Sequence, residues 1–393
     1  MTASTLKALS APRWTRFAAA IFVVALAPLC LLGAGTDLDA GSVLYSGRRI
    51  VHGGYVASRP PGSPVHETIA GVLDAVFGGW AINLMSLFAA VVLCAAVWLL
   101  LAREGVPRPW LAAALVAASP WFQIASTSTV DFVAAAALLV CGALALRHGR
   151  SVTAGVLCGL SVGMRISGVL IVIAMIVAEA TGDGKQRRRA FNAFVVAAGI
   201  GALAFVAPFL AANDSVVFAQ NDFRTGSAVS QLGRAVAKNI AYLGPLAVIA
   251  VALALPAIWH LRTQWSQRWI VRFATVGFVL SEALFVRFPW KMGHLIPAMM
   301  CLALLLAEAL RDRRVLFITI VIAQLAIGVV NVELLRPDVP NSATRASITF
   351  RVRPGPLVVD TLCRLDDRDA ARSRDVTRTE AVWNCAKPWG TGR

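Results

Sequence analysis

The chain has 393 residues, of which 58% are hydrophobic and only 15% charged, and its mean hydropathy is +0.70. An average soluble domain is closer to half apolar and a quarter charged, so this composition excludes an ordinary soluble globular protein. The apolar residues form long blocks, which indicates helices because a membrane-spanning backbone must satisfy its own polar groups. The alternating pattern of a membrane β-barrel is absent from the sequence. We therefore predict an all-α polytopic membrane protein.

The net charge of +16 does not indicate a nucleic-acid-binding protein. Basic residues fall mainly in short segments between apolar blocks, where membrane proteins carry positive charge on the cytoplasmic side. No basic patch interleaved with aromatic residues, the usual pattern of a nucleic-acid site, stands out. We expect membrane lipids rather than nucleic acid as partners.

The N-terminal region predicts an uncleaved first membrane span. Basic residues precede an apolar stretch over 17–33. A secretory signal peptide has the same order of features, but its apolar region is usually shorter and a clear small-x-small cleavage site is missing here. An uncleaved span leaves the N-terminus in the cytoplasm and turns the segment after residue 33 outward. We therefore expect a multi-pass protein of the plasma (inner) membrane.

Further apolar segments follow a short amphipathic stretch. Residues 65–79 are expected to form a partly polar helix along the membrane interface. The later segments cover residues 80–102, 110–126, 130–146, 152–164, 166–179, 191–212, 240–259, 270–286, 292–310 and 315–335. With the first span they make about 11 transmembrane helices, judged by the length that crosses a bilayer. This odd number predicts an extracytoplasmic C-terminus.

The basic residues test this arrangement. Every loop on the predicted inner side is basic, through Arg103, Arg108, Arg147, Arg150, Lys185, Arg187, Arg188, Arg189, Arg262, Arg268, Arg272, Arg311, Arg313 and Arg314. The agreement requires two short helices within 152–179, broken near Arg165, because a single span there would reverse every later loop. An arginine in such an apolar region is expected at the outer interface or beside a polar cavity.

The chain divides into two predicted parts. Residues 1–335 form a transmembrane domain with an outward catalytic loop over 34–66, and residues 336–393 form a short extracytoplasmic polar tail. An oxidising outer compartment permits a disulfide between Cys363 and Cys385, although spacing alone does not establish the bond. The other cysteines lie in apolar spans and are interpreted as small buried hydrophobic residues.

Three aspartates are candidates for chemistry at the outer side. Asp37 and Asp39 follow the first span directly, where an ionised carboxylate can act as a general base or bind a metal ion. Asp131 stands at the outer start of a later span, and acids at membrane depth are costly and often functional. The alternative for all three is an N-cap at the interface, a position that aspartate favours.

Cationic residues of the first loop form a second set of candidates. Arg48 and Arg59 lie on the side where topology does not require positive charge. The guanidinium group is suited to phosphate recognition, and contact with anionic lipid headgroups is the alternative. Arg59 begins an Arg-Pro-Pro-Gly-Ser-Pro turn, whose prolines restrict the backbone and can place Arg59 and the following Glu67 firmly.

A further basic group lies near the outer ends of two later spans. Arg287, Lys291 and His294 surround a Pro-Trp pair. A cation beside an interfacial tryptophan suits a lipid phosphate, while an aromatic and basic anchor belt is the alternative. Walker A, GxSxG and HExxH motifs are absent from the sequence, which argues against ATP-driven, serine-hydrolase and zinc-protease chemistry.

The order of these motifs resembles the GT-C superfamily of membrane glycosyltransferases, especially the protein O-mannosyltransferase and aminoarabinose transferase type. The first outward loop of such enzymes has acidic residues and then a small residue, Arg, any residue and a hydrophobic residue. The matching segments here are Asp39, Gly47-Arg48-Arg49-Ile50, Ser128-Thr129-Val130-Asp131, Met164-Arg165 and the segment from Pro289 to Pro297. The resemblance covers about residues 15–310.

The resemblance implies an inverting transfer of a sugar from a polyprenyl-phosphate donor to a glycan, lipid or protein acceptor on the outer face. It makes Asp39 the base and Asp131 a second acid of the site. Its candidates for the donor phosphate are Arg59, Arg165, Arg287 and Lys291, with His294 beside them. Ala40 stands where the superfamily often has a second acid, so the resemblance leaves open whether Asp37 substitutes and whether a divalent metal is needed.

A transporter or lipid flippase without transferase activity is the main alternative. Such a protein is expected to carry acids and bases deep within its spans. Apart from Glu282, the charges of this chain cluster near the outer span ends, which favours chemistry at the membrane surface. A non-catalytic membrane scaffold, in which Asp39 is only a helix cap, is the third interpretation.

Overall fold

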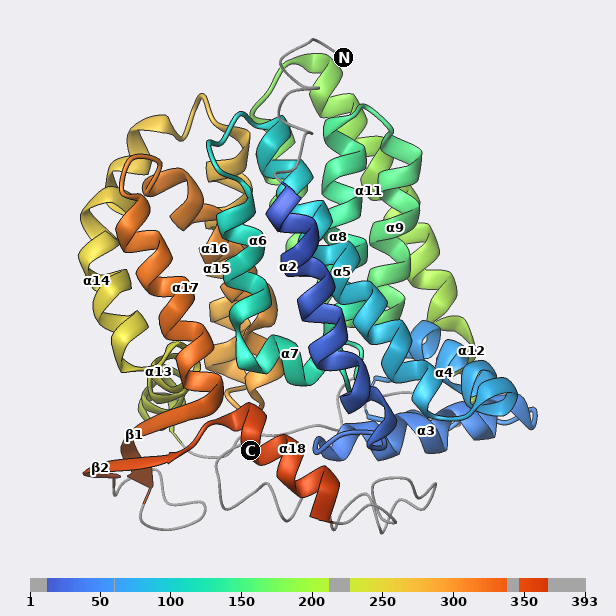
Figure 1. Ribbon diagram of the computed structural model, residues 1–393. Helices are drawn as coiled ribbons and strands as arrows, with labels where there is room; N and C mark the ends of the chain where they lie inside the picture. The colour runs from blue at the N-terminus through green and yellow to red at the C-terminus, as the bar shows by residue number, and fades with distance from the viewer. Residues whose placement is uncertain (1–12, 60, 212–226, 338–345, 367–393) are drawn as a thin grey trace.

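The structure, a computed structural model, describes residues 13–59, 61–211, 227–337 and 346–366 (Figure 1). Within these residues five helices are long and apolar enough to cross a membrane, and shorter apolar helices accompany them. The long ones are Trp80–Arg103, Gly184–Leu210, Pro245–Gln264, Trp269–Arg287 and Met292–Ala309. The predicted all-α membrane fold is confirmed, while the number of crossings stays a prediction.

Most predicted spans correspond to helices with nearby bounds. The first half contains α2 (Arg13–Leu26), η1 (Ala27–Leu31), α3 (Leu38–Val51), α4 (Pro64–Phe77), α5 (Trp80–Arg103), α6 (Trp110–Ala118), α7 (Pro120–Ser126), α8 (Phe132–Arg147), α9 (Ser151–Met164), η2 (Ile166–Gly168) and α10 (Val169–Ala180). The second half contains α11 (Gly184–Ala204), α12 (Val206–Ala211), α13 (Ala228–Leu243), α14 (Pro245–His260), η3 (Leu261–Gln264), α15 (Trp269–Arg287), η4 (Met292–Leu295), α16 (Ile296–Ala309), α17 (Arg314–Val329), β1 (Val330–Pro337), β2 (Ala346–Pro354) and α18 (Pro356–Asp366).

The predicted break at Arg165 is present and reverses the chain. Arg165 has an extended backbone (φ −155°, ψ 110°) between α9 and η2. Arg147, at the end of α8, donates from Nη1 to Glu179 near the end of α10 over 3.2 Å. Helix α9 begins near Arg147, and α10 ends near the same residue. The two helices are therefore antiparallel. Arg165 therefore lies at the far end of this pair.

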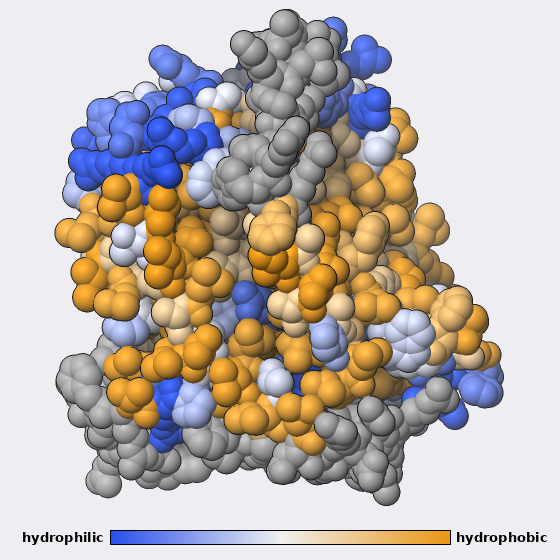
Figure 2. Space-filling view, viewed as in Figure 1, coloured by the Kyte–Doolittle hydropathy of each residue, from blue (hydrophilic) through white to orange (hydrophobic). Residues whose placement is uncertain are grey.

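The basic loops gather at one end of the bundle, at the top of Figure 1. Arg147 Nε lies 2.7 Å from Glu104, and Arg268 Nε lies 2.9 Å from Glu308. Figure 2 shows hydrophilic residues at this end and an apolar band across the middle of the visible face. At the opposite end lie α3, α4, α7, α18 and the β-hairpin. The loops predicted to share one side of the membrane therefore lie together.

Two stretches depart from the predicted bounds. The predicted outer loop 213–239 contains α13 from Ala228 onward, and the span expected over 240–259 is divided at Gly244. Gly244 has φ +74°, and a Cβ there would lie 2.5 Å from Ile327 Cδ1, so a tight turn against α17 separates α13 from α14. The last span, expected over 315–335, ends at Val329, where the chain becomes strand β1.

The helix predicted over 65–79 is present as α4, its position at the membrane interface stays a prediction, and α3 crosses it at two glycines. A Cβ on Gly71 would lie 2.2 Å from the Gly47 carbonyl oxygen, so the two backbones are in direct contact. Only glycine permits this separation, since any side chain would displace one helix. The crossing carries the start of α3, and with it the acidic residues of the first loop, over the end of the bundle.

The β-hairpin returns the chain to the bundle. Strands β1 and β2 pair antiparallel with Val330 opposite Pro354, so the residue after β2 comes back beside the end of α17. There the Gly355 amide donates to the Val329 carbonyl over 2.7 Å. Helix α18 then packs against α7 and α17. Cys363 is buried on α18, whereas Cys385 lies outside the described residues, so the proposed disulfide stays a prediction.

Candidate active site

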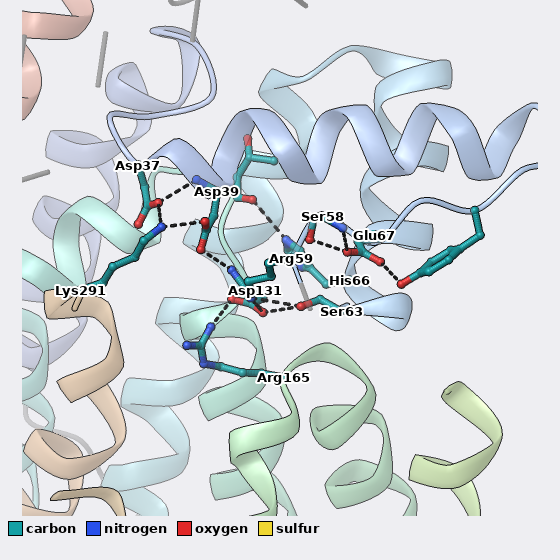
Figure 3. A network of polar contacts seen from close by, with 12 residues as sticks. Asp37, Asp39, Ser58, Arg59, Ser63, His66, Glu67, Asp131, Arg165 and Lys291 are labelled. Carbon is teal, nitrogen blue, oxygen red and sulfur yellow. Dashed lines mark hydrogen bonds and ion pairs between the residues drawn. The ribbon is translucent and has the colours of Figure 1, made fainter. Parts of the chain in front are cut away.

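Three aspartates from two distant segments meet at the end of the bundle opposite the basic loops (Figure 3). Asp37 is the N-cap of α3, and its Oδ1 accepts from the Asp39 amide over 2.9 Å. Asp39 follows in the first turn of α3, and Asp131 precedes α8. Capping, the alternative interpretation, therefore accounts for Asp37 but leaves the Asp39 carboxylate free for other contacts.

Three cations lie between these carboxylates. Lys291 Nζ is 2.6 Å from Asp37 Oδ1 and 2.7 Å from Asp39 Oδ1. Arg59 Nη1 donates to Asp39 Oδ2 over 2.7 Å, and its Nη2 donates to Asp131. Arg165 Nη1 donates to Asp131 Oδ1 over 2.8 Å. These six side chains form a continuous network, which we call the acid–base cluster, and their formal charges cancel.

Asp131 is the buried centre of the acid–base cluster. Its side chain is fully buried, whereas the side chain of Asp39 keeps 16% of its surface exposed. Besides the two arginines, Ser63 donates to Asp131 Oδ2 over 2.9 Å. Charge-assisted hydrogen bonds of this kind hold their partners in fixed orientations. Asp131 thus fixes Arg59 and Arg165, while Asp39 stays partly exposed.

Glu67 holds the loop that carries Arg59. Its carboxylate accepts from the Ser58 amide over 2.8 Å and from the Tyr55 hydroxyl over 2.7 Å, and the Ser58 hydroxyl also donates to it. Glu67 is fully buried on α4. The candidate Glu67 therefore holds the loop that carries Arg59, and among the described contacts it has no hydrogen bond or ion pair with the three aspartates.

Arg165 and His294 are linked through an aromatic ring. The Arg165 guanidinium lies 4.0 Å from the centre of the Phe132 ring, and that ring lies 5.6 Å from the His294 ring. A cation over an aromatic face is attracted by the ring electrons, so the Phe132 ring gives the Arg165 guanidinium a second contact besides Asp131. His294 thus lies against the ring that Arg165 contacts, and among the described contacts it has no ion pair with the three aspartates.

Two predicted phosphate-binding candidates lie apart from the cluster. Arg48 Nε donates to Asp74 on α4 over 2.8 Å. The Arg287 guanidinium lies 4.8 Å from the centre of the Phe288 ring. Neither has an ion pair with Asp37, Asp39 or Asp131 among the described contacts.

The cluster perturbs the acidity of its members. Burial alone would raise the pKa of Asp39, but the charges of Arg59 and Lys291 outweigh it and hold this pKa well below its ordinary value. For Asp131, burial is likewise outweighed by Arg59 and Arg165, and the pKa falls to about 2. Burial opposes the charge of Lys291, yet Asp37 and Asp39 raise its pKa overall. Asp39, Asp131 and Lys291 are therefore charged at neutral pH.

Comparison with known proteins decides the family. Residues 60–287, more than half of the chain, match glycosyltransferase family 87. The chain belongs to glycosyltransferase family 87. The matched residues include Asp131 and Arg165, but Asp37, Asp39, Arg59 and Lys291 lie outside them. No curated protein sequence matches the chain.

Two solved structures share the fold of this family 87 glycosyltransferase. ArnT from Cupriavidus metallidurans bound to undecaprenyl phosphate aligns with a TM-score of 0.59 and 18% identity, covering 96% of this chain and 76% of ArnT. The apo state of the same ArnT gives a TM-score of 0.55 and 18% identity, covering 97% and 76%. The predicted resemblance to GT-C membrane glycosyltransferases is confirmed.

A metal ion between the two first-loop aspartates would have to replace a lysine. Among the described residues of this family 87 enzyme, no three His, Cys, Asp or Glu side chains are grouped as metal ligands. The position between Asp37 and Asp39 holds the Lys291 ammonium group. Lysine therefore already supplies the positive charge that would otherwise come from an ion at this point.

Two contributors to the site, Ser63 and Phe132, are not evident as site residues from the sequence. Ser63 was visible only as part of the proline-rich turn, and Phe132 only as the first apolar residue of a span. Their roles depend on contacts with Asp131 and Arg165, which lie far from Ser63 in the sequence. A polar residue within a rigid turn was the available signal for Ser63, and no local pattern indicated Phe132.

Proposed function

We propose that this family 87 glycosyltransferase moves a sugar from a polyprenyl-phosphate donor to an acceptor at the end of the bundle that holds the acid–base cluster. The observation that carries the proposal is Asp39, an accessible carboxylate flanked by Arg59 and Lys291. Such a site offers a proton acceptor and two phosphate-binding cations within one small region. The ArnT of similar fold is bound to undecaprenyl phosphate, which supports a lipid-linked donor.

The proposed reaction is a single displacement at the anomeric carbon. The acceptor hydroxyl loses its proton to Asp39 as its oxygen forms a bond to that carbon. The bond from the carbon to the donor phosphate oxygen breaks, and polyprenyl phosphate leaves with one additional negative charge. Arg59, Arg165 and Lys291 stabilise this developing charge. One displacement inverts the anomeric configuration.

Donor binding is proposed to activate the base. In the present structure Arg59 and Lys291 hold Asp39 ionised but make it a poor proton acceptor, because they keep its pKa low. The charges of the cluster cancel, so an added phosphate must share these same cations. Each cation shared with phosphate holds Asp39 less strongly, and the pKa of Asp39 rises toward its ordinary value. The carboxylate then becomes an effective base only when the donor is present.

The geometry favours Asp39 over the other aspartates as the base. Asp131 is fully buried beneath two arginines and Ser63, so an acceptor cannot reach it without displacing them. Asp37 already accepts a hydrogen bond from the Asp39 amide as the cap of α3. Asp39 lacks a capping role and stays partly exposed.

We further propose that the cluster lies on the outer face of the plasma membrane, with the N-terminus in the cytoplasm. The basic loops at the other end of the bundle support this orientation, since positive charge collects on the cytoplasmic side. The acceptor would then be a glycan, lipid or protein of the cell envelope. A transporter or flippase fits less well, because the described acids and bases of the cluster gather at one end of the bundle.

The test compares three strains, with the wild-type protein, without it, and with Asp39→Asn at matched abundance. Mass spectrometry of envelope glycans is expected to show the same sugar missing in the deletion and in the Asp39→Asn strain. Purified wild-type protein should transfer that sugar from a synthetic polyprenyl-phosphate donor, and Asp39→Asn should not. Full transfer by Asp39→Asn would reject this residue as the base. A sugar lost only in the deletion strain would favour transport or scaffolding.

A further inference from the structure

Helix α18 carries a fully buried ion pair outside the acid–base cluster. Arg364 Nη2 lies 3.0 Å from Asp360 Oδ2, and both side chains have no exposed surface. A buried pair of charges carries a large desolvation cost and is retained only where further hydrogen bonds satisfy it. The contacts of each partner therefore indicate what the pair does.

Arg364 binds the segment that leads to Asp131. Its Nη1 donates to the Thr127 carbonyl over 2.9 Å, and its Nη2 donates to the Ser128 hydroxyl over 2.7 Å. Ser128 lies three residues before Asp131 in the short loop between α7 and α8. The guanidinium thus holds this loop from the side of α18 through a backbone and a side-chain acceptor.

Asp360 binds the segment that leads to Asp37 and Asp39. The Thr36 hydroxyl donates to Asp360 Oδ1 over 2.5 Å. The neighbouring Gly35 has φ +110°, and a Cβ there would lie 2.6 Å from the Ser128 hydroxyl oxygen and 3.3 Å from Arg364 Nη2. The first-loop segment therefore passes directly against the pair and against the Asp131 loop.

We propose that Asp360 and Arg364 are positioning residues, which set the distance between the Asp37–Asp39 segment and the Asp131 loop. Asp360 holds the first-loop segment through Thr36, and Arg364 holds the Asp131 loop while its Nη1 also donates to the Leu29 carbonyl, ahead of the first loop, over 3.3 Å. The ion pair joins these contacts and so fixes the separation between the two segments. Neither residue belongs to the acid–base cluster. The inference rests on the proposed transferase function for its effect on activity, but its structural part is independent of that function.

The position of α18 explains how a helix so late in the chain reaches the site. The hairpin of β1 and β2 leaves α17 and returns Gly355 to the Val329 carbonyl, which delivers α18 to the same end of the bundle. A Cβ on Gly355 would lie 2.3 Å from the Gly328 carbonyl oxygen, so the helix starts in backbone contact with α17. The ion pair is thereby anchored to the bundle as well as to the two segments.

The test uses three variants of the full-length protein in detergent or lipid. Arg364→Gln removes the charge that binds the Asp131 loop. Thr36→Val keeps the shape of the side chain and removes only the hydroxyl that donates to Asp360. It therefore tests the proposal even if Arg364→Gln fails to fold. Leu362→Ala, on the exposed side of α18, is the matched control. Hydrogen–deuterium exchange and steady-state transfer are measured for each.

Arg364→Gln is expected to speed exchange in peptides covering 33–41 and 127–131, not only in α18. Its kcat is expected to fall about 10- to 100-fold, because displaced catalytic groups lose reactive geometry. Thr36→Val should lower kcat about 3- to 10-fold, as for one lost hydrogen bond. The donor KM should change little in both, and Leu362→Ala should match the wild type.

Faster exchange confined to α18 would overturn the proposal, as would unchanged kcat in variants whose two segments exchange faster. An equal loss of kcat in Leu362→Ala would show general damage to α18 and would also overturn it. Absence of transfer by the wild-type protein would reject the proposed function instead. In that case the exchange of the two segments in Arg364→Gln still decides whether the ion pair holds them.

Discussion

The Nζ atom of Lys291 lies 2.7 Å from Oδ1 of Asp39, although the two residues come from opposite halves of the chain. Lys291 precedes η4 and Asp39 lies in α3, so the contact joins the last third of the bundle to the first outward loop. The same ammonium group also contacts Asp37. A bound phosphate would compete with both carboxylates for it, and this competition leads to the first two predictions.

Replacing Lys291 with methionine should weaken donor binding. Lys291→Met keeps the length of the side chain and removes its charge, so kcat/KM for the donor is expected to fall by about 100-fold or more, as for other charge-stabilising groups. Lys291→Arg keeps the charge and should lose less. Steady-state transfer with varied donor concentration measures both variants.

Arg287→Gln is the matched control for this experiment. Arg287 is a cation at the same end of the bundle, but its guanidinium lies against Phe288 instead of in the acid–base cluster. Its removal is expected to change the donor KM less than threefold, roughly the effect of a lost surface charge. A wild-type donor KM in Lys291→Met, or equal losses in both variants, would contradict the assignment.

The pH dependence of transfer should differ between free and donor-bound enzyme. The pKa of Asp39 is held low by Arg59 and Lys291, so kcat/KM is expected to stay level to below about pH 4, the ordinary range of aspartate. Donor phosphate shares these cations and raises the pKa of Asp39, so kcat should begin to fall at least about one pH unit higher. If kcat and kcat/KM fell at the same pH, donor binding would not weaken the interaction of Arg59 and Lys291 with Asp39.

Asp131→Asn should destabilise the protein as well as inactivate it. The variant leaves Arg59 and Arg165 without their shared buried carboxylate, which typically costs about 3–5 kcal/mol. The pKa of Asp131 is lowered to about 2, below the unfolded value, so its contribution to stability is present above about pH 4 and is lost as pH falls through about 2. Thermal unfolding across this range should therefore show less acid sensitivity in Asp131→Asn. A wild-type unfolding temperature and pH slope would refute the central role of Asp131.

The crossing of α3 and α4 should not tolerate a side chain. Gly71→Ala places a Cβ 2.2 Å from the Gly47 carbonyl oxygen, and the resulting shift of α3 is expected to cost about 1–3 kcal/mol, as overpacking does. Gly199→Ala is the matched control, because it lies within α11 with nothing near its Cβ and should be neutral or slightly stabilising. Thermal unfolding and transfer activity are the measurements. Equal unfolding temperatures for the two variants would show that the glycine contact is unimportant.

Long apolar segments and loop charge predicted the helices with good accuracy. The first complete span, Trp80–Arg103, ends within one residue of the prediction, and the break at Arg165 follows from the charge of the flanking loops. The apolar segments are local features, and basic loops recur on alternate sides of successive spans. Both can therefore be recognised in the sequence without knowledge of the tertiary structure. The hairpin β1–β2 was missed because it continues an apolar span without a turn signal between them, and α13 was missed because it lies in a segment without a recognised motif.

The candidate site shows the same division. Charge type and outward placement selected Asp37, Asp39, Arg59, Asp131, Arg165 and Lys291, all of which the fold brings together. The same criteria also selected Arg48 and Arg287, which the fold turns toward Asp74 and Phe288. A residue type and a side of the membrane do not specify which partner a flexible cation reaches.

The sequence by itself determined that this protein is a helical membrane protein, which of its loops share a side, and which charged residues gather at one end. Composition and periodicity suffice for this, because hydrocarbon imposes the same requirement on every spanning segment. Only the tertiary structure decided that Asp131 is the buried centre, that Lys291 lies between Asp37 and Asp39, and that Arg364 reaches the Asp131 loop. These contacts join residues distant in sequence, and their energies depend on burial and on ångström-scale distances that no local pattern encodes.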